Sequence, residues 1–422
     1  GTLVRFRIKT AGKDGPARVE PAPNEPRSSY SAYFLEPATA PKIPIVTVLN
    51  LDPIRGGNQK FGPPRNDAIK NGNSAFVYVP PEGQAELFDF VQVRRRSGGW
   101  KAHFFKDQLL DGMSGLNIIF EGPPRWVLSE YLAYELYRRA GVRTEKSGHF
   151  RLVMDGRQLG YHLFIEQPNK TFLGRTGGNP DGNLYKILWY EHGVVRQHEK
   201  KTNLETGHQD VVNVIEGLNR KSGAAQWAYI QENFDVPEVA GYYAVNMCIE
   251  NWDGFFNNYF TYHHPDRDGK WEIIPWDEDK TWGEYDGGPY NYDWFDMPLT
   301  YGMNGDNGGG GVRSFFGGGP FGGGAQWWRP PGYFSGPLLA NPQFRKEFET
   351  KLRELCETVF NEEKFGPVVE ALKLRLRPEV TLRAQVMHEN PSGALQRFDN
   401  EIASYHRQLA NRRRYILAHL PK

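Results

Sequence analysis

Residues 251–258 read Asn-Trp-Asp-Gly-Phe-Phe-Asn-Asn, and they are followed by two strand-like runs, 259–262 and 271–274, and by Asp277-Glu278-Asp279. Both runs are β-branched and aromatic, and Asp268-Gly269 between them is a strong hairpin signal. Such a hairpin returns Asp277 to the neighbourhood of Asp253 and Asn258. Three oxygen-bearing side chains then converge at one end of a small sheet. That arrangement suits a hard divalent cation and the phosphates that the cation carries.

The spacing of two of these side chains is more informative than their acidity. Asp253 and Asn258 stand in the D-x-x-x-x-N relation of the protein-kinase catalytic loop, where the Asp accepts the proton of the substrate hydroxyl and the Asn holds a metal ion. Asp277, after the next hairpin, occupies the place of the kinase metal-binding Asp. By itself the motif is weak, and a polar loop whose Asp and Asn make turn hydrogen bonds is the better interpretation without further context.

Further segments supply that context. Residues 251–258 and residues 274–283, Ile-Pro-Trp-Asp-Glu-Asp-Lys-Thr-Trp-Gly, resemble the core of the CotH family, the spore-coat-protein-H-like atypical protein kinases. The second segment is the more specific one. The likeness covers most of the chain from about Ile45 onward and includes residues 100–104, 131–136, 159–167, 336–338 and 341–344.

The resemblance implies an α+β, two-lobed, atypical protein-kinase-like fold. Its N-terminal lobe has an antiparallel sheet and one main helix, and its C-terminal lobe is mainly helical. We therefore expect an extended arm in residues 1–44, an N-lobe in residues 45–166 and a C-lobe in residues 167–422. The arm is expected to be irregular from Ala11 to Pro44, because that segment is crowded with Pro, Ser and Glu.

Patterning predicts the elements of both lobes. β-rich runs predict strands at residues 43–49, 74–79, 86–96, 100–105, 149–154 and 159–165. Three- and four-residue apolar steps predict helices at residues 125–140, 210–218, 237–250, 341–359, 364–376 and 395–419. Gly141 is expected to stop the first of these helices, and Asp235 with Glu238 to cap the third.

Composition narrows the class of protein. The chain of 422 residues is 39% hydrophobic and 24% charged, which is typical of a globular protein, and its formal net charge of +1 does not favour a nucleic-acid binder. Residues 94–96 and 412–414 are arginine runs, which are more often solvated or ion-paired than bound to nucleic acid. Cys248 and Cys356 are expected to be buried free thiols. No apolar run is long enough to span a bilayer, and the chain opens without a signal peptide.

Two lysines are candidate phosphate ligands. Alternation in the strand at residues 100–105 puts Lys101, His103 and Phe105 on one face. Lys101 is either a side chain whose stem covers apolar surface, or the kinase lysine that grips the phosphates and pairs with a helix glutamate, here Glu130 or Glu135. Lys186, in a further segment that resembles the family, is the alternative, although it requires the loop after the lobe junction to fold back.

The junction of the lobes is expected near Ile165 to Pro168, where Glu166 and Gln167 lie beside the nucleotide base and backbone groups hydrogen-bond the adenine. The family usually has an Arg-Gly-Asn-Ser-like turn over the phosphates, whereas this chain has the shorter Arg-Ser-Gly-Gly at residues 96–99. Glycine-rich sequence at residues 308–324 occupies the place of a kinase activation segment.

The resemblance implies a kinase that transfers the γ-phosphoryl group of ATP, with Mg²⁺ or Mn²⁺, to a Ser or Thr hydroxyl of a protein that is not identified, with autophosphorylation as one possibility. Asp253 then orients or deprotonates the acceptor, Asn258 and Asp277 hold metal, Asp279 holds a second metal, and Lys101 binds phosphate. We expect a monomer, secreted or associated with a surface, with no nucleic-acid partner. Two alternatives stay open: a structural or adhesive surface protein with a residual nucleotide site, and a carbohydrate-active enzyme, since paired Asp residues amid Trp and Tyr also fit glycoside chemistry.

Overall fold

The computed structural model describes residues 1–11, 15–35, 42–50, 74–188, 193–264, 269–284, 293–303 and 332–421. The chain forms two compact units, and each is discontinuous in sequence. Unit 1 comprises Gly1–Gly122, Ser147–Gln167 and Leu374–Phe398. Unit 2 comprises Pro123–Lys146, Pro168–Lys373 and Asp399–Lys422. The N-terminal part of the chain is rich in strands, and its C-terminal part ends in helices.

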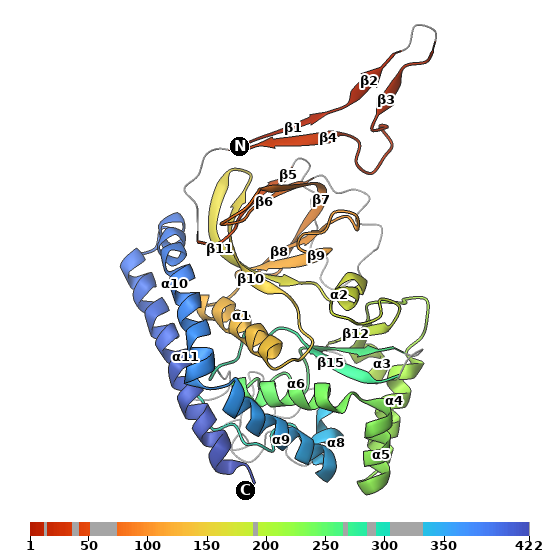
Figure 1. Cartoon of the computed structure of the whole chain (residues 1–422), viewed down its shortest axis with the longest axis vertical. Helices are drawn as coiled ribbons and strands as arrows, with labels where there is room; N and C mark the ends of the chain where they lie inside the picture. Colours follow the sequence, from red (N-terminus) through yellow and green to blue (C-terminus); the bar gives the residue numbers. More distant parts are fainter. Residues whose placement is uncertain are drawn as a thin grey trace, which may run out of the picture. The chain divides into compact units, whose positions relative to one another are not determined.

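Unit 1 is built around a closed barrel (Figure 1), whose strands are Ile45–Asn50 (β5), Ser74–Val79 (β6), Glu86–Arg96 (β7), Gly99–His103 (β8), Gly115–Ile119 (β9), Ser147–Met154 (β10) and Arg157–Glu166 (β11). They follow one another around the barrel in the order β10, β11, β9, β8, β7, β6, β5. Neighbouring strands are antiparallel, except that β10 and β5 run parallel where the barrel closes.

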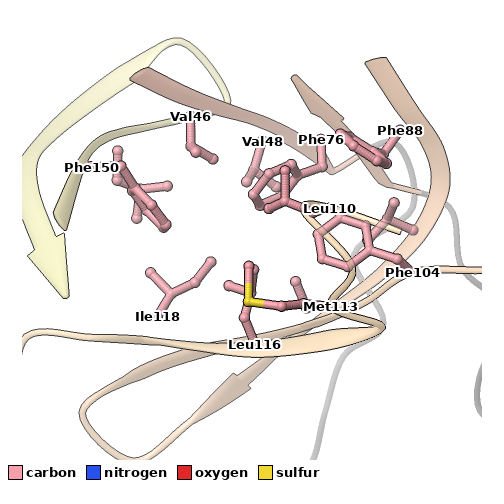
Figure 2. Packing of buried hydrophobic residues seen from close by; sticks show 13 residues of the cluster. Val46, Val48, Phe76, Phe88, Phe104, Leu110, Met113, Leu116, Ile118 and Phe150 are labelled. Atoms are coloured by element: carbon pink, nitrogen blue, oxygen red, sulfur yellow. The ribbon is translucent and has the colours of Figure 1, made fainter. Parts of the chain in front are cut away.

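Apolar side chains fill the inside of the barrel (Figure 2). The ring of Phe104 lies edge-on to the rings of Phe76 and Phe88, with 5.1 Å between centroids in each pair. In β8, Ala102 belongs to this core. Because successive side chains of a strand point to opposite faces, Lys101 is turned to the outside of the barrel.

The arm of unit 1 is more regular than its sequence predicts. Thr2–Phe6 (β1) pairs with Tyr30–Phe34 (β4), and Ile8–Thr10 (β2) pairs with Arg18–Glu20 (β3). The side chain of Arg5 donates to the carboxylate of Asp89 in β7, which ties the arm to the barrel. The prediction of an irregular segment from Ala11 to Pro44 is therefore wrong where β3 and β4 form.

Helix Glu362–Val386 (α10) brings its second half into unit 1. Arg151 of β10 makes a bidentate ion pair with the buried Glu379, at 3.0 and 2.7 Å. The guanidinium of Arg383 lies 3.3 Å from the centroid of the Phe120 ring and donates to the carbonyl of Leu159. These contacts explain why residues 374–398, predicted in the C-lobe, belong to the same unit as the barrel.

Unit 2 contains a sheet in the order β13, β12, β14, β15, formed by His198–Lys200, Asn183–Ile187, Tyr259–His263 and Trp271–Pro275 respectively. Its helices are Pro124–Arg139 (α1), Lys170–Arg175 (α2), Val194–Gln197 (α3), Gln209–Arg220 (α4), Gly223–Asn233 (α5), Val236–Ile249 (α6), Ser335–Ala340 (α8), Pro342–Thr358 (α9) and most of Pro391–His419 (α11). Helix α6 packs against α9 and β15 (Figure 1).

Helix α6 is the element that delivers the candidate site. Asp235 caps its start by accepting from the backbone N–H of Glu238 at 3.2 Å, as the sequence predicts. The helix ends at Glu250, which adopts the left-handed conformation (φ 56°). The chain then turns directly into the loop of residues 251–258.

The predicted strands and helices are present, and two further features differ from the prediction. The N-terminal sheet is a closed barrel with a strand, β9, that the sequence did not reveal. Helix α1, predicted in the N-lobe, belongs to unit 2. Residues 304–331, including the predicted activation segment, and the turn at Asp268 lie outside the described residues.

Candidate functional site

The hairpin of β14 and β15 brings the two halves of the predicted site together. Tyr259 pairs with Pro275 in its register. Asn258 and Trp276 are therefore the next residues at the same end of the hairpin, with Asp277 one position further. The expected return of Asp277 to the neighbourhood of Asn258 is thus built into the strand pairing.

Asp253 and Asn258 are joined directly. The amide nitrogen Nδ2 of Asn258 donates to Oδ2 of Asp253 at 2.9 Å, and Oδ1 of Asn258 accepts from Asn257 at 2.8 Å. The backbone N–H groups of Phe256 and Asn257 donate to the carbonyl of Asp253. The loop between the two is one tight turn, which closes with Asn258 in the left-handed conformation (φ 53°).

Hydroxyl groups hold the backbone of this loop from several elements. Tyr301 donates to the carbonyl of Trp252 at 2.8 Å, and Tyr242 of α6 donates to the carbonyl of Gly254, also at 2.8 Å. Ser335 of α8 donates to the carbonyl of Phe255 at 2.6 Å. These three hydrogen bonds come from different elements and together restrain the backbone of the loop to a defined path.

The acidic run after β15 alternates between solvent and interior. Asp277 and Asp279 are half-buried, whereas Glu278 between them is fully buried. Asp277 has a positive φ of 63°. Burial raises the pKa of the Glu278 carboxyl well above its usual range, although hydrogen bonds from Asn251 and Tyr137 act in the opposite direction. The run therefore presents two carboxylates outward and fixes the third inside.

A buried arginine of α1 holds the end of this acidic segment. Nη2 of Arg125 donates to the carbonyl of Trp282 at 2.6 Å, and its Nη1 donates to Glu401 and to Ser404 of α11. The guanidinium lies 4.6 Å from the centroid of the Tyr405 ring. A planar fork with five donors suits such a set of contacts better than an ammonium group does.

A second buried arginine contacts the end of α6, where the loop of residues 251–258 begins. Arg412 of α11 donates to the carbonyls of Met247, Phe295 and Met297 at 2.9, 3.0 and 2.8 Å, and its Nη1 lies 3.7 Å from the carboxylate of Glu250. Burial raises the pKa of Glu250 to about 8, with Arg412 acting against it. The expectation of a solvated arginine run is wrong for Arg412, which is fully buried.

Lys186 lies in β12, which belongs to the same sheet as β14 and β15. It pairs with Phe260 across β12 and β14, and its Nζ is 4.9 Å from the centroid of the Trp276 ring. Strand pairing and this contact place Lys186 beside the residue that precedes Asp277. Its role as a phosphate ligand stays a prediction.

Lys101 stands on the outer face of the barrel among polar and basic groups. Its Nζ donates to Oε1 of Gln167, which also accepts from Asn117 at 3.4 Å, and Asn117 in turn accepts from Arg96 at 3.0 Å. The pKa of His103 falls to about 3 because of burial and the neighbouring charges of Lys101 and Arg94. Lys101, Arg94 and Arg96 therefore lie close together on these two strands, and Arg96 is also 3.6 Å from the carboxylate of Glu121.

The other predicted nucleotide residues are less accessible. Glu166 is buried at the end of β11, and the backbone N–H of Gln167 already donates to the carbonyl of Gly115 at 2.9 Å. Glu130 is buried in α1, with the hydroxyl of Tyr134 3.5 Å from its carboxylate. Lys101 and Glu130 belong to different units.

The donor set of unit 2 fits a hard cation. Asp277, Asp279 and Asn258 offer only oxygen ligands that reach solvent, which favours Mg²⁺ or Mn²⁺ over softer metals. Within the described ranges, no three His, Cys, Asp or Glu side chains gather closely enough to bind an ion by themselves. A bound cation would therefore take further oxygen ligands from the amide of Asn258, water or phosphate.

Comparison with known proteins places the chain in a family. The family model described as CotH kinase protein matches residues 98–416, so the chain belongs to the CotH kinase family. This confirms the resemblance noted in the sequence. A relative, the Inner spore coat protein H of Bacillus subtilis, is 21% identical over 331 residues, which cover 75% of this chain and 81% of the relative.

Among solved structures, one chain in the complex of the Shewanella oneidensis MR-1 toxin-antitoxin system HipA, HipB and its operator DNA matches at 14% identity with a TM-score of 0.23. The match covers 71% of this chain and 60% of that chain, less than two thirds of its length. In the parts of the chain that are described, each helix is too short or too polar to cross a lipid bilayer.

Proposed function

We propose that the chain is an atypical protein kinase that transfers the γ-phosphoryl group of ATP to a Ser or Thr hydroxyl of a protein, in a reaction that depends on Mg²⁺ or Mn²⁺. One observation carries the proposal: a loop with D-x-x-x-x-N spacing, closed by the hydrogen bond between Asp253 and Asn258, lies at the same hairpin end as Asp277. Membership of the CotH kinase family supports it.

The proposed roles follow from exposure and chemistry. Asp253, half-buried at the turn, orients the acceptor hydroxyl and takes its proton. Asn258 and Asp277 hold one cation, and Asp279 holds a second. The cations neutralise charge on the transferring phosphoryl group when they are bound. Unit 1 and unit 2 then correspond to the two lobes of the kinase-like fold.

The positive face of the barrel suits the phosphates of the nucleotide. The ammonium of Lys101 donates to the side chain of Gln167, and Arg94 is its neighbour across β7 and β8, so two basic side chains stand together where an anionic ligand would bind. Glu130 is the helix glutamate that the family resemblance assigns to nucleotide binding, and Glu166 and Gln167 line the proposed base site. Lys186, beside Trp276, is the alternative phosphate lysine.

A second candidate function is a structural coat-type protein with a residual nucleotide site. The printed name of the relative, an inner spore coat protein, favours this candidate. It predicts nucleotide binding without turnover. The printed name of the relative also supports a proposed surface-associated location.

A phosphoryl-transfer assay distinguishes the kinase from the coat-type protein. Purified full-length chain is incubated with γ-labelled ATP and Mg²⁺ or Mn²⁺, alone and with a panel of proteins, and the labelled residue is identified after acid hydrolysis. A kinase gives phosphoserine or phosphothreonine that chelation by EDTA abolishes. ATP binding by calorimetry together with no incorporated label would reject the kinase proposal in favour of the coat-type protein.

A further inference from the structure

The side chain of Asn251 joins the two loops of the site in unit 2. Its Nδ2 donates to Oε2 of the buried Glu278 at 2.8 Å. Its Oδ1 accepts from the backbone N–H groups of Asp253 at 3.2 Å and Gly254 at 2.9 Å. The side-chain amide of Asn251 therefore donates to the acidic segment and accepts from the turn that carries Asp253.

Glu278 extends the connection to two helices. Its Oε1 lies 3.4 Å from the hydroxyl of Tyr137 in α1, and that hydroxyl donates to Oδ1 of Asn246 in α6 at 2.8 Å. All four side chains are buried. Glu278 is thus the point at which the acidic segment, the Asp253 turn and both helices meet.

The space around this network is full. A Cβ atom built on Gly254 would stand 2.6 Å from Oδ1 of Asn246 and 2.6 Å from Nδ2 of Asn251. Distances below 3.0 Å force a shift of the neighbouring atoms. Packing as well as hydrogen bonding therefore restricts where the Asp253 turn can lie.

We propose that Glu278 is a positioning residue, which sets the place of Asp253 relative to Asp277 and Asp279 through its hydrogen bond to Asn251. Two facts carry this inference. The carboxyl of Glu278 is turned inward while its two acidic neighbours are turned outward, and it bonds a residue that holds two backbone amides of the Asp253 turn. The inference rests on the proposed kinase function, because it assigns Glu278 to the geometry of that site.

A pair of substitutions separates hydrogen bonding from packing. Glu278→Met keeps the length of the side chain and removes both polar contacts. Glu278→Gln keeps a carbonyl oxygen that can accept from Asn251. Because a displacement of 1 Å in a catalytic group can cost about 100-fold in rate, we expect Glu278→Met to lower kcat by about 100-fold with little change in KM for ATP. Glu278→Gln should recover at least about tenfold of that loss.

Amide hydrogen exchange tests the position of the Asp253 turn without any measurement of catalysis. In the full-length protein, the amides of Asp253 and Gly254 should exchange faster in Glu278→Met than in the wild type, whereas peptides of α9 should be unchanged. Glu278→Gln should restore slow exchange. If Glu278→Met does not fold, Asn251→Asp keeps an oxygen that can accept from both amides but loses the donor to Glu278, and it should accelerate exchange at the same two amides.

The outcomes separate failure of the inference from failure of the proposed function. Wild-type exchange and wild-type kcat in Glu278→Met would overturn the positioning role. Equal losses in Glu278→Gln and Glu278→Met would also overturn it, because the carboxylate itself would then be needed. A wild-type chain without transfer activity would reject the kinase proposal, and exchange at Asp253 and Gly254 would still decide whether Glu278 positions the turn.

Discussion

Replacing Arg412 by methionine should destabilise unit 2 strongly while keeping its fold. The substitution retains an apolar stem but removes every donor of the guanidinium, which is fully buried. It leaves Glu250 without its cation at 3.7 Å and leaves three carbonyls, at 2.8 to 3.0 Å, without this donor. Leaving a buried hydrogen-bond acceptor without its donor costs about 1–3 kcal/mol for each group, so the loss of three such bonds should cost about 3–5 kcal/mol or more.

That cost is a large share of the stability of a folded domain, which is about 5–15 kcal/mol. We therefore expect Arg412→Met to unfold at clearly lower urea concentration, with a drop in Tm of about 10 °C. Circular dichroism during urea and thermal unfolding measures both quantities. Arg414→Met is the matched control, because Arg414 belongs to the same arginine run but is exposed, and it should change stability by less than about 0.5 kcal/mol.

A second variant tests the cause of the loss. Burial raises the pKa of Glu250 to about 8 even beside Arg412, so its carboxyl ionises only at alkaline pH. Glu250→Gln combined with Arg412→Met should therefore be more stable than Arg412→Met alone at alkaline pH, where the buried carboxylate would have no cation beside it. A folded Arg412→Met protein whose unfolding free energy lies within about 1 kcal/mol of Arg414→Met would refute the reasoning, since the buried contacts would then contribute little.

Three further predictions concern the site and its surroundings. Asp277→Ala should abolish Mg²⁺-dependent binding of ATP in calorimetry while circular dichroism stays unchanged, because Asp277 supplies an outward carboxylate at the hairpin end; unchanged affinity would remove it from the metal site. Lys101→Met should weaken ATP binding more than Lys186→Met, since Lys101 lies on the positive face of the barrel whereas Nζ of Lys186 lies over Trp276, and the reverse order would assign the phosphate role to Lys186. Burial raises the pKa of Glu238 from 4.5 to about 7. Between pH 4.5 and 7 the carboxyl of Glu238 is protonated in the folded chain but ionised in the unfolded chain. The free energy of unfolding that Glu238 contributes therefore falls as pH rises through 7. The free energy of unfolding of Glu238→Gln minus that of the wild type should therefore rise by about 2 kcal/mol from pH 5 to pH 8, as measured by urea unfolding. Parallel pH profiles of the two proteins would contradict this prediction.

Local patterns in the sequence were sufficient to predict the hairpin and the helix that precedes the site. Alternating aromatic and β-branched residues, turn signals and the cap at Asp235 act over a few residues, so each could be identified in isolation. The register of β14 and β15 then follows, and with it the approach of Asp277 to Asn258. The family resemblance added roles for these residues, which stay predictions.

Features that depend on distant segments were not predictable in the same way. The barrel closes where β5 pairs in parallel with β10, about a hundred residues later in the chain, and no local pattern specifies such a partner. Arg412 looked like part of a solvated run because its partners, Met247 and Glu250, are remote in sequence. Lys186 looked distant from the site for the same reason.

The inward position of Glu278 had no reliable local signal. It stands between Asp277 and Asp279, but β15 ends at Pro275 and Asp277 has a φ of 63°, so the side chains do not simply alternate as in a strand. A buried carboxyl needs hydrogen-bond partners, and in this chain Asn251 and Tyr137 provide them.

The most direct test of the account compares binding with transfer in Asp253→Ala. If Asp253 acts on the acceptor hydroxyl, the variant should bind ATP and Mg²⁺ in calorimetry with an affinity close to that of the wild type, while incorporation of label from γ-labelled ATP falls by about 10²- to 10⁴-fold. Asp181→Ala, at an exposed aspartate of unit 2, is the control and should leave both unchanged. A folded Asp253→Ala protein that transfers phosphate at nearly the wild-type rate would contradict the central claim.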